Sequence, residues 1–202
     1  ENVNYVGGIV GAMNVSSYVG KESAIIEKCY NTGKISGKSH IGGIAGRLSV
    51  EASMESCYNV GLIEGNNLVG GLAGETVENT GYIANSYNKG EVIADSIHVG
   101  GSIGVIRSKV ENCYNSGTVE IKSTNDRIGG LFGALDISYV EKEKIKNCYY
   151  LDSSYSKACG NESVIGNIEG AKSITDEELK NLAETLGSEF KKNEEGDMYP
   201  KL

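Results

Sequence analysis

One glycine-rich hexapeptide occurs five times in this chain of 202 residues. The copies are VGGIVG (6–11), IGGIAG (41–46), VGGLAG (69–74), VGGSIG (99–104) and IGGLFG (128–133). Their glycine pairs start 28 to 35 residues apart. A recurrence at this period indicates a chain that is built from one repeated supersecondary unit.

A second block travels with each hexapeptide and completes the repeat. Its copies are CYNTGKI from Cys29, CYNVGLI from Cys57, SYNKGEV from Ser86, CYNSGTV from Cys113 and CYYLDSS from Cys148. Each unit then holds three short apolar stretches separated by Gly, Asn or Ser, too short and too interrupted for a helical repeat. The pattern predicts an all-β fold: a right-handed parallel β-helix (β-solenoid) of about five coils.

In such a fold, equivalent residues of successive coils stack in columns about 4.8 Å apart. We expect two interior columns, which are Ile35, Ile63, Val92 and Val119, and Ile26, Met54, Ile83, Val110 and Ile145. We also expect an amide ladder in which each asparagine side chain bonds to the next, made by Asn31, Asn59, Asn88 and Asn115.

Glycines and bends follow from the same columns. The glycine pair of the hexapeptide is expected to permit a bend and a close approach of coils. A tight turn with positive φ is predicted at Gly33, Gly61, Gly90 and Gly117. A bend is predicted at Lys28, Ser56, Asn85, Asn112 and Asn147, which turns the Cys/Ser column inward. An outward or corner stack is expected for Tyr30, Tyr58, Tyr87, Tyr114 and Tyr149.

The end of the chain has a different pattern. We divide the chain into repeats over 1–160 and a C-terminal cap over 161–202, with an amphipathic α-helix at about 175–192. Thr175 and Glu178 match a capping box, and Gly187 is a stop signal. Because the last coil of a solenoid exposes strand edges, we expect this helix to lie across that end. The chain starts almost inside a repeat, so we expect further domains upstream in a longer protein.

Charge and composition restrict the partners. A net charge of -8 without a basic cluster argues against nucleic acid. No run of about 18 apolar residues is present, so we expect no membrane insertion of this segment. We expect no cofactor, no metal and no catalytic residue, since the sequence has no metal-protease pattern and no phosphate loop.

The hexapeptide and its CYNxGxI companion resemble the GLUG-motif repeat of bacterial cell-surface and secreted proteins, over about residues 5–155. The resemblance also extends to the tail, but Ser102 and the Tyr150-Leu151 pair depart from the motif. It implies an extracellular or cell wall-exposed bacterial domain, and it supplies no catalytic residues.

Four groups of residues are candidate sites. A disulfide between Cys148 and Cys159 is considered, because they are close in sequence without being repeat equivalents. Glu27, Glu55 and Glu111 share a column, which we interpret as a solvated face in preference to a cation site. His40 and His98 are expected to lie two coils apart, too far to share zinc. Tyr18 and Tyr139, on the two longest arms, could stack on sugars or grip a peptide, or could merely cover the flank.

The sequence thus favours a non-enzymatic surface module, an adhesion or structural spacer domain of a larger bacterial protein. Its expected partner is a host or matrix protein or a glycan. Two alternatives stay open: a carbohydrate-active β-helix enzyme (polysaccharide lyase or glycosidase), motivated by the fold class alone, and a self-association segment, motivated by the open first coil.

Overall fold

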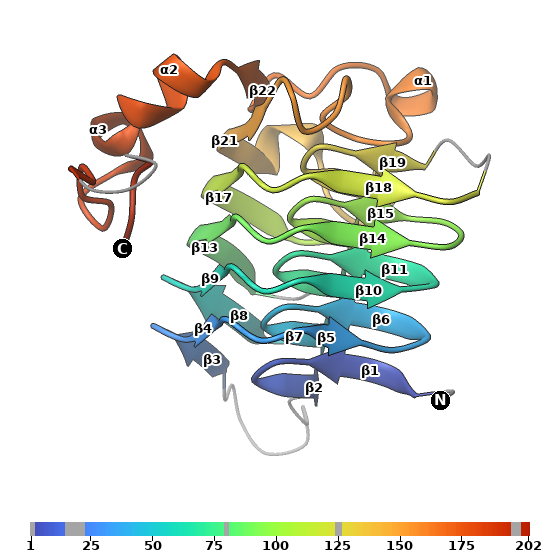
Figure 1. The fold of residues 1–202 in the computed structure, drawn as a ribbon. Helices are drawn as coiled ribbons and strands as arrows, with labels where there is room; N and C mark the ends of the chain where they lie inside the picture. Colours follow the sequence, from blue (N-terminus) through green and yellow to red (C-terminus); the bar gives the residue numbers. More distant parts are fainter. Residues whose placement is uncertain (1–2, 15–22, 79–80, 124–126, 195–198) are drawn as a thin grey trace.

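The computed structural model describes residues 3–14, 23–78, 81–123, 127–194 and 199–202. Its strands form the stacked coils of a parallel β-solenoid (Figure 1). The chain returns to the starting sheet four times, which gives about four full turns.

Four sheets form the walls of the solenoid. Sheet A contains β1 (Asn4–Gly7), β6 (Ser39–Gly42), β11 (Asn67–Gly70), β15 (Val99–Gly100) and β19 (Ile128–Gly129). Sheet B contains β2 (Val10–Met13), β7 (Ala45–Leu48), β12 (Ala73–Thr76), β16 (Ile103–Ile106) and β20 (Phe132–Leu135). Sheet C contains β3 (Ala24–Glu27), β4 (Tyr30–Asn31), β8 (Ala52–Glu55), β9 (Tyr58–Asn59), β13 (Tyr82–Asn88), β17 (Lys109–Asn115), β21 (Ile145–Leu151) and β22 (Ala171–Ile174). Sheet D contains β5 (Ile35–Ser36), β10 (Ile63–Gly65), β14 (Val92–Ala94) and β18 (Val119–Ile121).

The hexapeptide therefore makes two strands, although the sequence pattern indicated only three short apolar stretches for each whole unit. In each copy the chain leaves sheet A at the glycine pair and enters sheet B three residues later. A Cβ on Gly42 would lie 2.7 Å from the Cα of Ala73 in the next coil, and one on Gly71 would lie 2.2 Å from the Cγ of Asn88. The first glycine thus allows coils to approach, and the second leaves room for the amide ladder.

The predicted columns are confirmed. Strand register aligns both apolar columns, and most of their members are fully buried. In the ladder, the Nδ2 of Asn31, Asn59 and Asn88 each donates to the Oδ1 of the next asparagine at 2.7 to 2.8 Å. Each of these amides also bonds the glycine two residues later, so that buried polar groups are satisfied within the coil.

The bend in sheet C is also where the column argument placed it. Lys28, Ser56, Asn85, Asn112 and Asn147 all have φ between 49° and 52°. The positive φ predicted at Gly33, Gly61, Gly90 and Gly117 is wrong, because the positive-φ glycines of the described chain are Gly166 and Gly187. The physical reason for glycine in that column is space: a Cβ on Gly61 would lie 2.0 Å from the carbonyl oxygen of Gly33.

The tyrosines stack outside the coil, as expected. Neighbouring rings from Tyr30 to Tyr114 are nearly parallel, with centroids 4.9 to 5.1 Å apart. Tyr30 is 57% exposed, whereas Tyr87, Tyr114 and Tyr149 are buried. A cover must therefore lie over the later coils only.

That cover is the C-terminal tail, and two expectations about it are wrong. In place of the single helix predicted at about 175–192, the tail has two short helices, α2 (Asp176–Lys180) and α3 (Ala183–Leu186). Helix α2 ends early because the side chain of Asn181 donates to the carbonyl of Glu177. Capping by Thr175 and Glu178 and a stop at Gly187 are confirmed.

The tail also lies on the flank of the solenoid and not across its end (Figure 1). Leu179, Leu182, Leu186 and Phe190 pack against the tyrosine stack, because these outward rings are the apolar surface that needs burial. The last coil is closed by other parts of the chain, namely β22, the bridge of Cys159 to Phe132, and α1 (Glu162–Ile165). The described residues contain one further helix, η1 (Lys142–Lys144).

Candidate functional site

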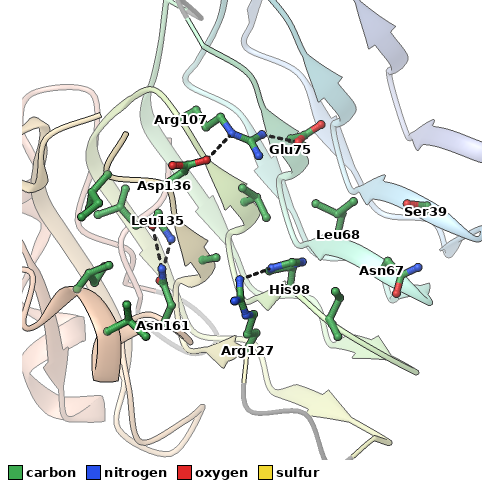
Figure 2. Close-up of a pocket in the computed structure, with 16 residues that line it drawn as sticks. Ser39, Asn67, Leu68, Glu75, His98, Arg107, Arg127, Leu135, Asp136 and Asn161 are labelled. Carbon is green, nitrogen blue, oxygen red and sulfur yellow. Dashed lines mark hydrogen bonds and ion pairs between the residues drawn. The ribbon is translucent and has the colours of Figure 1, made fainter. Parts of the chain in front are cut away.

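A groove of about 660 Å³ lies over the outer face of sheet B at β12, β16 and β20, and its lining also includes Ser39 of β6 and Asn67 and Leu68 of β11 in sheet A. Strand alternation creates this face, because each residue that points outward follows one that points into the core. One outward column is aligned by the register of sheet B and consists of Ala12, Arg47, Glu75, Val105 and Ala134. The last three members of this column, Glu75, Val105 and Ala134, line the groove. Figure 2 shows Glu75 among the labelled lining residues.

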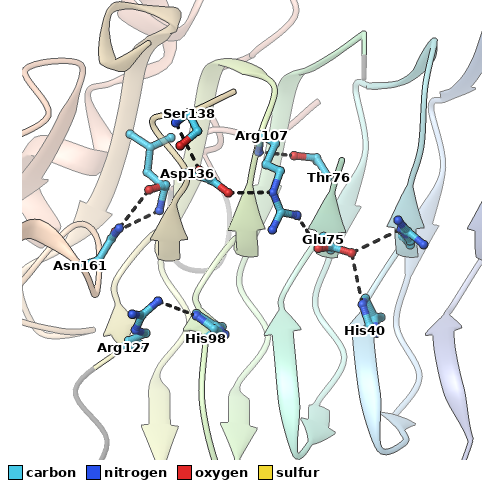
Figure 3. Close-up of polar contacts among 11 residues, drawn as sticks. His40, Glu75, Thr76, His98, Arg107, Arg127, Asp136, Ser138 and Asn161 are labelled. Carbon is cyan, nitrogen blue, oxygen red and sulfur yellow. Dashed lines mark hydrogen bonds and ion pairs between the residues drawn. The ribbon is translucent and has the colours of Figure 1, made fainter. Parts of the chain in front are cut away.

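Arg107 bridges two carboxylates along one wall of the groove (Figure 3). Its Nη1 lies 2.5 Å from Glu75 Oε1, and its Nε donates to Asp136 Oδ2 at 3.0 Å. The other oxygen of Glu75 is 3.2 Å from His40 Nε2 and 3.3 Å from Arg47 Nε. Glu75 thus pairs with Arg47 and Arg107, and Asp136 pairs with Arg107.

The Glu75 carboxylate stays ionised. Burial alone would raise its pKa, but hydrogen bonds from His40 and Arg107 and the charge of Arg107 outweigh burial and lower the pKa to about 2. Glu75 can thus accept hydrogen bonds but cannot serve as a proton donor near neutral pH.

The opposite wall contains His98 and Arg127. Arg127 Nη1 lies 3.0 Å from His98 Nε2, and because the guanidinium can only donate, the ring proton is assigned to Nδ1. Burial, followed by the charges of Arg127 and Arg107, lowers the pKa of His98 to about 4. The imidazole is therefore neutral at physiological pH.

One end of the groove is closed by the turn that carries Asn161 and α1. The Asn161 amide mimics a neighbouring strand: its Oδ1 accepts from Leu135 N at 3.0 Å and its Nδ2 donates to Leu135 O at 2.9 Å. Val164 of α1 lines the rim and is 82% exposed. The end wall is therefore fixed to β20 by two hydrogen bonds between the Asn161 side chain and the main chain of Leu135.

The two histidines have separate partners. His40 lies beside Ser39 and Glu75, and its ring centroid is 4.5 Å from that of Tyr5. His98 lies beside Arg127. Both adopt positive φ, as do Tyr5 and Leu68 in the same column, a second row of left-handed residues that the sequence did not reveal.

The expected glutamate column is present on sheet C. Register aligns Glu27 with Glu55 and Glu111 with Lys146, and Ala84 interrupts the column. Glu55 accepts from Tyr82 Oη at 2.8 Å, and Glu111 pairs with Lys109. Within the described parts of the chain, no three His, Cys, Asp or Glu side chains are grouped as a metal site requires.

A second amide ladder runs along the bend of sheet C and was missed. Asn147 Nδ2 donates to Asn112 Oδ1 at 3.2 Å, Asn112 Nδ2 to Asn85 Oδ1 at 3.0 Å, and Asn85 Nδ2 to Glu55 Oε1 at 3.3 Å. The bend column did contain these three asparagines, which favour the left-handed region. That shared residue type was the available signal.

The two aromatic candidates have different outcomes. Tyr18 lies outside the described residues. Tyr139 is 52% exposed, and the Arg107 guanidinium lies 5.6 Å from its ring centroid. Tyr139 therefore borders the groove wall that Arg107 forms.

The disulfide considered between Cys148 and Cys159 is not formed, and all five cysteines are free. The reason is orientation: Cys148 Sγ lies 3.2 Å from Lys146 O, whereas Cys159 Sγ contacts Asn161 Oδ1 at 3.0 Å. Burial raises the pKa of Cys57 to about 11 and that of Cys159 to about 12.

These thiols give a first prediction. We expect a thiol reagent such as DTNB to modify the native protein at half-buried Cys29, and the other four cysteines only after unfolding, because thiolates are the reactive form. The released chromophore, followed over time with and without urea, measures this. Fewer than five reactive thiols in unreduced, unfolded protein would show that a disulfide forms after all.

The pKa of His98 gives a second prediction. The pKa of His98 is about 6.5 in the unfolded chain and about 4 in the folded one, so the unfolded chain binds the proton first as the pH falls. The contribution of His98 to stability is therefore highest above pH 6.5 and decreases as the pH falls from 6.5 to 4. We expect the free energy of unfolding of the wild type to fall by about 1–2 kcal/mol between pH of about 7.5 and about 5 because of His98, and this decrease to be absent in His98→Gln. Urea unfolding at both pH values measures it. His40→Gln, which keeps His98, should retain the loss; a wild-type slope in His98→Gln would contradict the assignment.

Comparisons with protein-family models, curated proteins and solved structures give no significant match. Among the helices of the described chain, none is long and apolar enough to span a membrane. The candidate site is the groove over sheet B, because it brings together paired charges, hydrogen-bonding side chains and apolar residues.

Proposed function

We propose that this chain is a non-enzymatic, surface-displayed repeat module, an adhesion or structural spacer domain of a larger bacterial protein that is extracellular or wall-exposed. The observation that carries the proposal is the unbroken stack of coils, tied lengthwise by main-chain bonds and the buried asparagine ladder. Such a stack holds its outer faces in a fixed geometry, which suits display and spacing. The cellular address rests on the resemblance to GLUG-motif repeats.

The chemistry of the groove supports binding in preference to catalysis. Its acid Glu75 has a lowered pKa and is occupied by ion pairs, whereas a glycosidase acid needs a raised pKa. An assay of soluble protein on a glycan array and on host cells and matrix proteins tests the proposal. Specific binding to any of these supports adhesion. No binding to the array, the cells or the matrix proteins leaves the spacer role.

The enzymatic alternative, a polysaccharide lyase or glycosidase, is tested by the same protein on a polysaccharide panel. Turnover that disappears in Asp136→Asn would replace the binding proposal, because that carboxylate is the half-buried acid at the groove wall.

Self-association is favoured by one specific observation. Among the described residues, the outer edges of β1, β2, β3 and β5 in the first coil pair with no further strand, and Ile9 there is 47% exposed although its equivalent Ile44 is fully buried. Light scattering over a concentration series tests this alternative, and a strict monomer would exclude it.

A further inference from the structure

The groove over β12, β16 and β20 is lined by both apolar and charged side chains (Figure 2). Leu68, Val105 and Ala134 are apolar residues of its lining, and Val105 and Ala134 belong to the same outward column of sheet B. Val105 and Ala134 are 4% and 5% exposed, so the half-buried Leu68 presents more open surface than either of them. Charged side chains stand on both sides: the Glu75–Arg107–Asp136 array on one and the His98–Arg127 pair on the other (Figure 3). A volume of about 660 Å³ lies within the range of small-molecule sites.

The charges in this groove cancel. Of the residues that line it, Glu75 and Asp136 carry two negative charges and Arg107 and Arg127 carry two positive ones, and His98 is neutral near pH 7. Arg47 also pairs with Glu75 but is not part of the lining. A charged ligand would have to compete with an existing ion pair. An uncharged ligand can instead bond to the donors and acceptors of these side chains that the ion pairs do not use. The groove thus favours a ligand that is neutral overall and rich in hydrogen-bonding groups.

Unused hydrogen-bonding capacity is built into the walls. A guanidinium carries five N–H donors, and the side-chain bonds of Arg107 to Glu75 and Asp136 use its Nη1 and Nε. Each carboxylate oxygen accepts more than one bond, so Asp136 and Glu75 can accept from a hydroxyl while they hold Arg107. Hydroxyl groups, which both donate and accept, match such a wall better than amides or cations do.

We propose that this groove is a sugar-binding subsite that receives a neutral pyranose, with the C–H face of the ring on Leu68, above the buried Val105 and Ala134, and the hydroxyls toward Arg107, Asp136 and His98. The proposal rests on the adhesion form of the proposed function and names its ligand class. Asn161 and α1 close one end, so the chain of a glycan leaves along the groove toward β12.

The test uses methyl glucoside, methyl galactoside and methyl N-acetylglucosaminide as neutral probes and methyl glucuronide as the acidic one. Saturation-transfer NMR and titration of the intact protein should show binding of at least one neutral probe in the millimolar range, a ΔG of about -4 kcal/mol. Ala134→Met fills the base of the groove and should weaken binding at least about tenfold. Its control is Ala12→Met, on the same column but exposed on the first coil and outside the groove, which should bind as wild type.

A second variant keeps the proposal falsifiable if Ala134→Met is poorly folded. Asp136→Asn preserves the shape of the wall and leaves the groove with one net positive charge, so the ratio of glucuronide to glucoside affinity should rise several-fold. No signal from any neutral pyranoside at about 50 mM, or equal affinity in Ala134→Met and wild type, would overturn the proposal. Preference for an extended peptide over every sugar probe would also overturn it.

Failure here is distinguishable from failure of adhesion itself. If Ala134→Met still binds cells or the glycan array as wild type does, the adhesion function stands and the groove is not its site. If wild type binds the pyranosides but no cell or matrix, the groove assignment stands and the adhesive role falls.

Discussion

Gly90→Ala is expected to destabilise the protein by at least about 3 kcal/mol, and Gly33→Ala to change the free energy of unfolding by less than about 0.5 kcal/mol. Both glycines occupy the same column, and neither has positive φ. A Cβ on Gly90 would lie 2.1 Å from the carbonyl oxygen of Gly61 and 2.7 Å from Asn59 Nδ2. A Cβ on Gly33 meets nothing closer than Asn31 Oδ1 at 3.7 Å.

The clash at Gly90 involves backbone of the coil below, which cannot rotate away as a flexible side chain would. Urea unfolding followed by far-UV circular dichroism gives the two free energies of unfolding. A Gly90→Ala protein as stable as Gly33→Ala would show that neighbouring coils separate at little cost, and the explanation of this glycine column by close approach would be lost.

Asn88→Ala is expected to lower the free energy of unfolding by about 3–4 kcal/mol. The Asn88 amide bonds Asn59 below, Asn115 above and both main-chain groups of Gly90. Its removal leaves several buried donors and acceptors without this partner. Each such group destabilises the folded state by its desolvation penalty, which is larger than the net stabilisation that the hydrogen bond had contributed.

The matched control is Asn31→Ala at the open end of the ladder. Asn31 bonds one neighbouring asparagine, where Asn88 bonds two, and it is 9% exposed, where Asn88 is 0% exposed, so a loss of about 1–2 kcal/mol is expected. Chemical denaturation of both variants, with the dependence on denaturant compared, measures the difference. Equal losses would mean that the bonds between coils add nothing to those within the Asn-x-Gly turn.

The fold was predictable because, in a repeat protein, the sequence alignment of one repeat with the next already shows which distant residues are in contact. Once Asn31 and Asn59 are recognised as equivalent, parallel pairing places them one strand spacing apart, and the same step aligns Ile26 with Met54. The bend at Asn85 followed from one requirement, that Ile83 and Ser86 both point inward.

The sequence could not decide what the tail covers. Its apolar residues predicted an amphipathic surface, but two apolar targets competed: the last coil and the tyrosine flank. The tyrosines were recognised as outward, yet their burial depends on tertiary contacts with Leu186 and Phe190 that no repeat encodes.

The groove was missed for a related reason. Its key residues differ in type from coil to coil, so no column of like residues marks the site. Arg107 and Asp136 do follow their hexapeptides at the same distance, and alignment of opposite charges would have placed them side by side. Glu75 joins them from a neighbouring column, which only the stacked coils reveal.

The tail packed on the tyrosine stack has a mechanical consequence. When the ends of the chain are pulled apart, strands that run across the axis come off one coil at a time, and each coil releases 27 to 29 residues, or roughly 100 Å of length. Tyr87, Tyr114 and Tyr149 belong to three coils that one tail covers. Under tension, the early coils are therefore expected to yield first, and the later ones to hold until the tail is torn from its tyrosines.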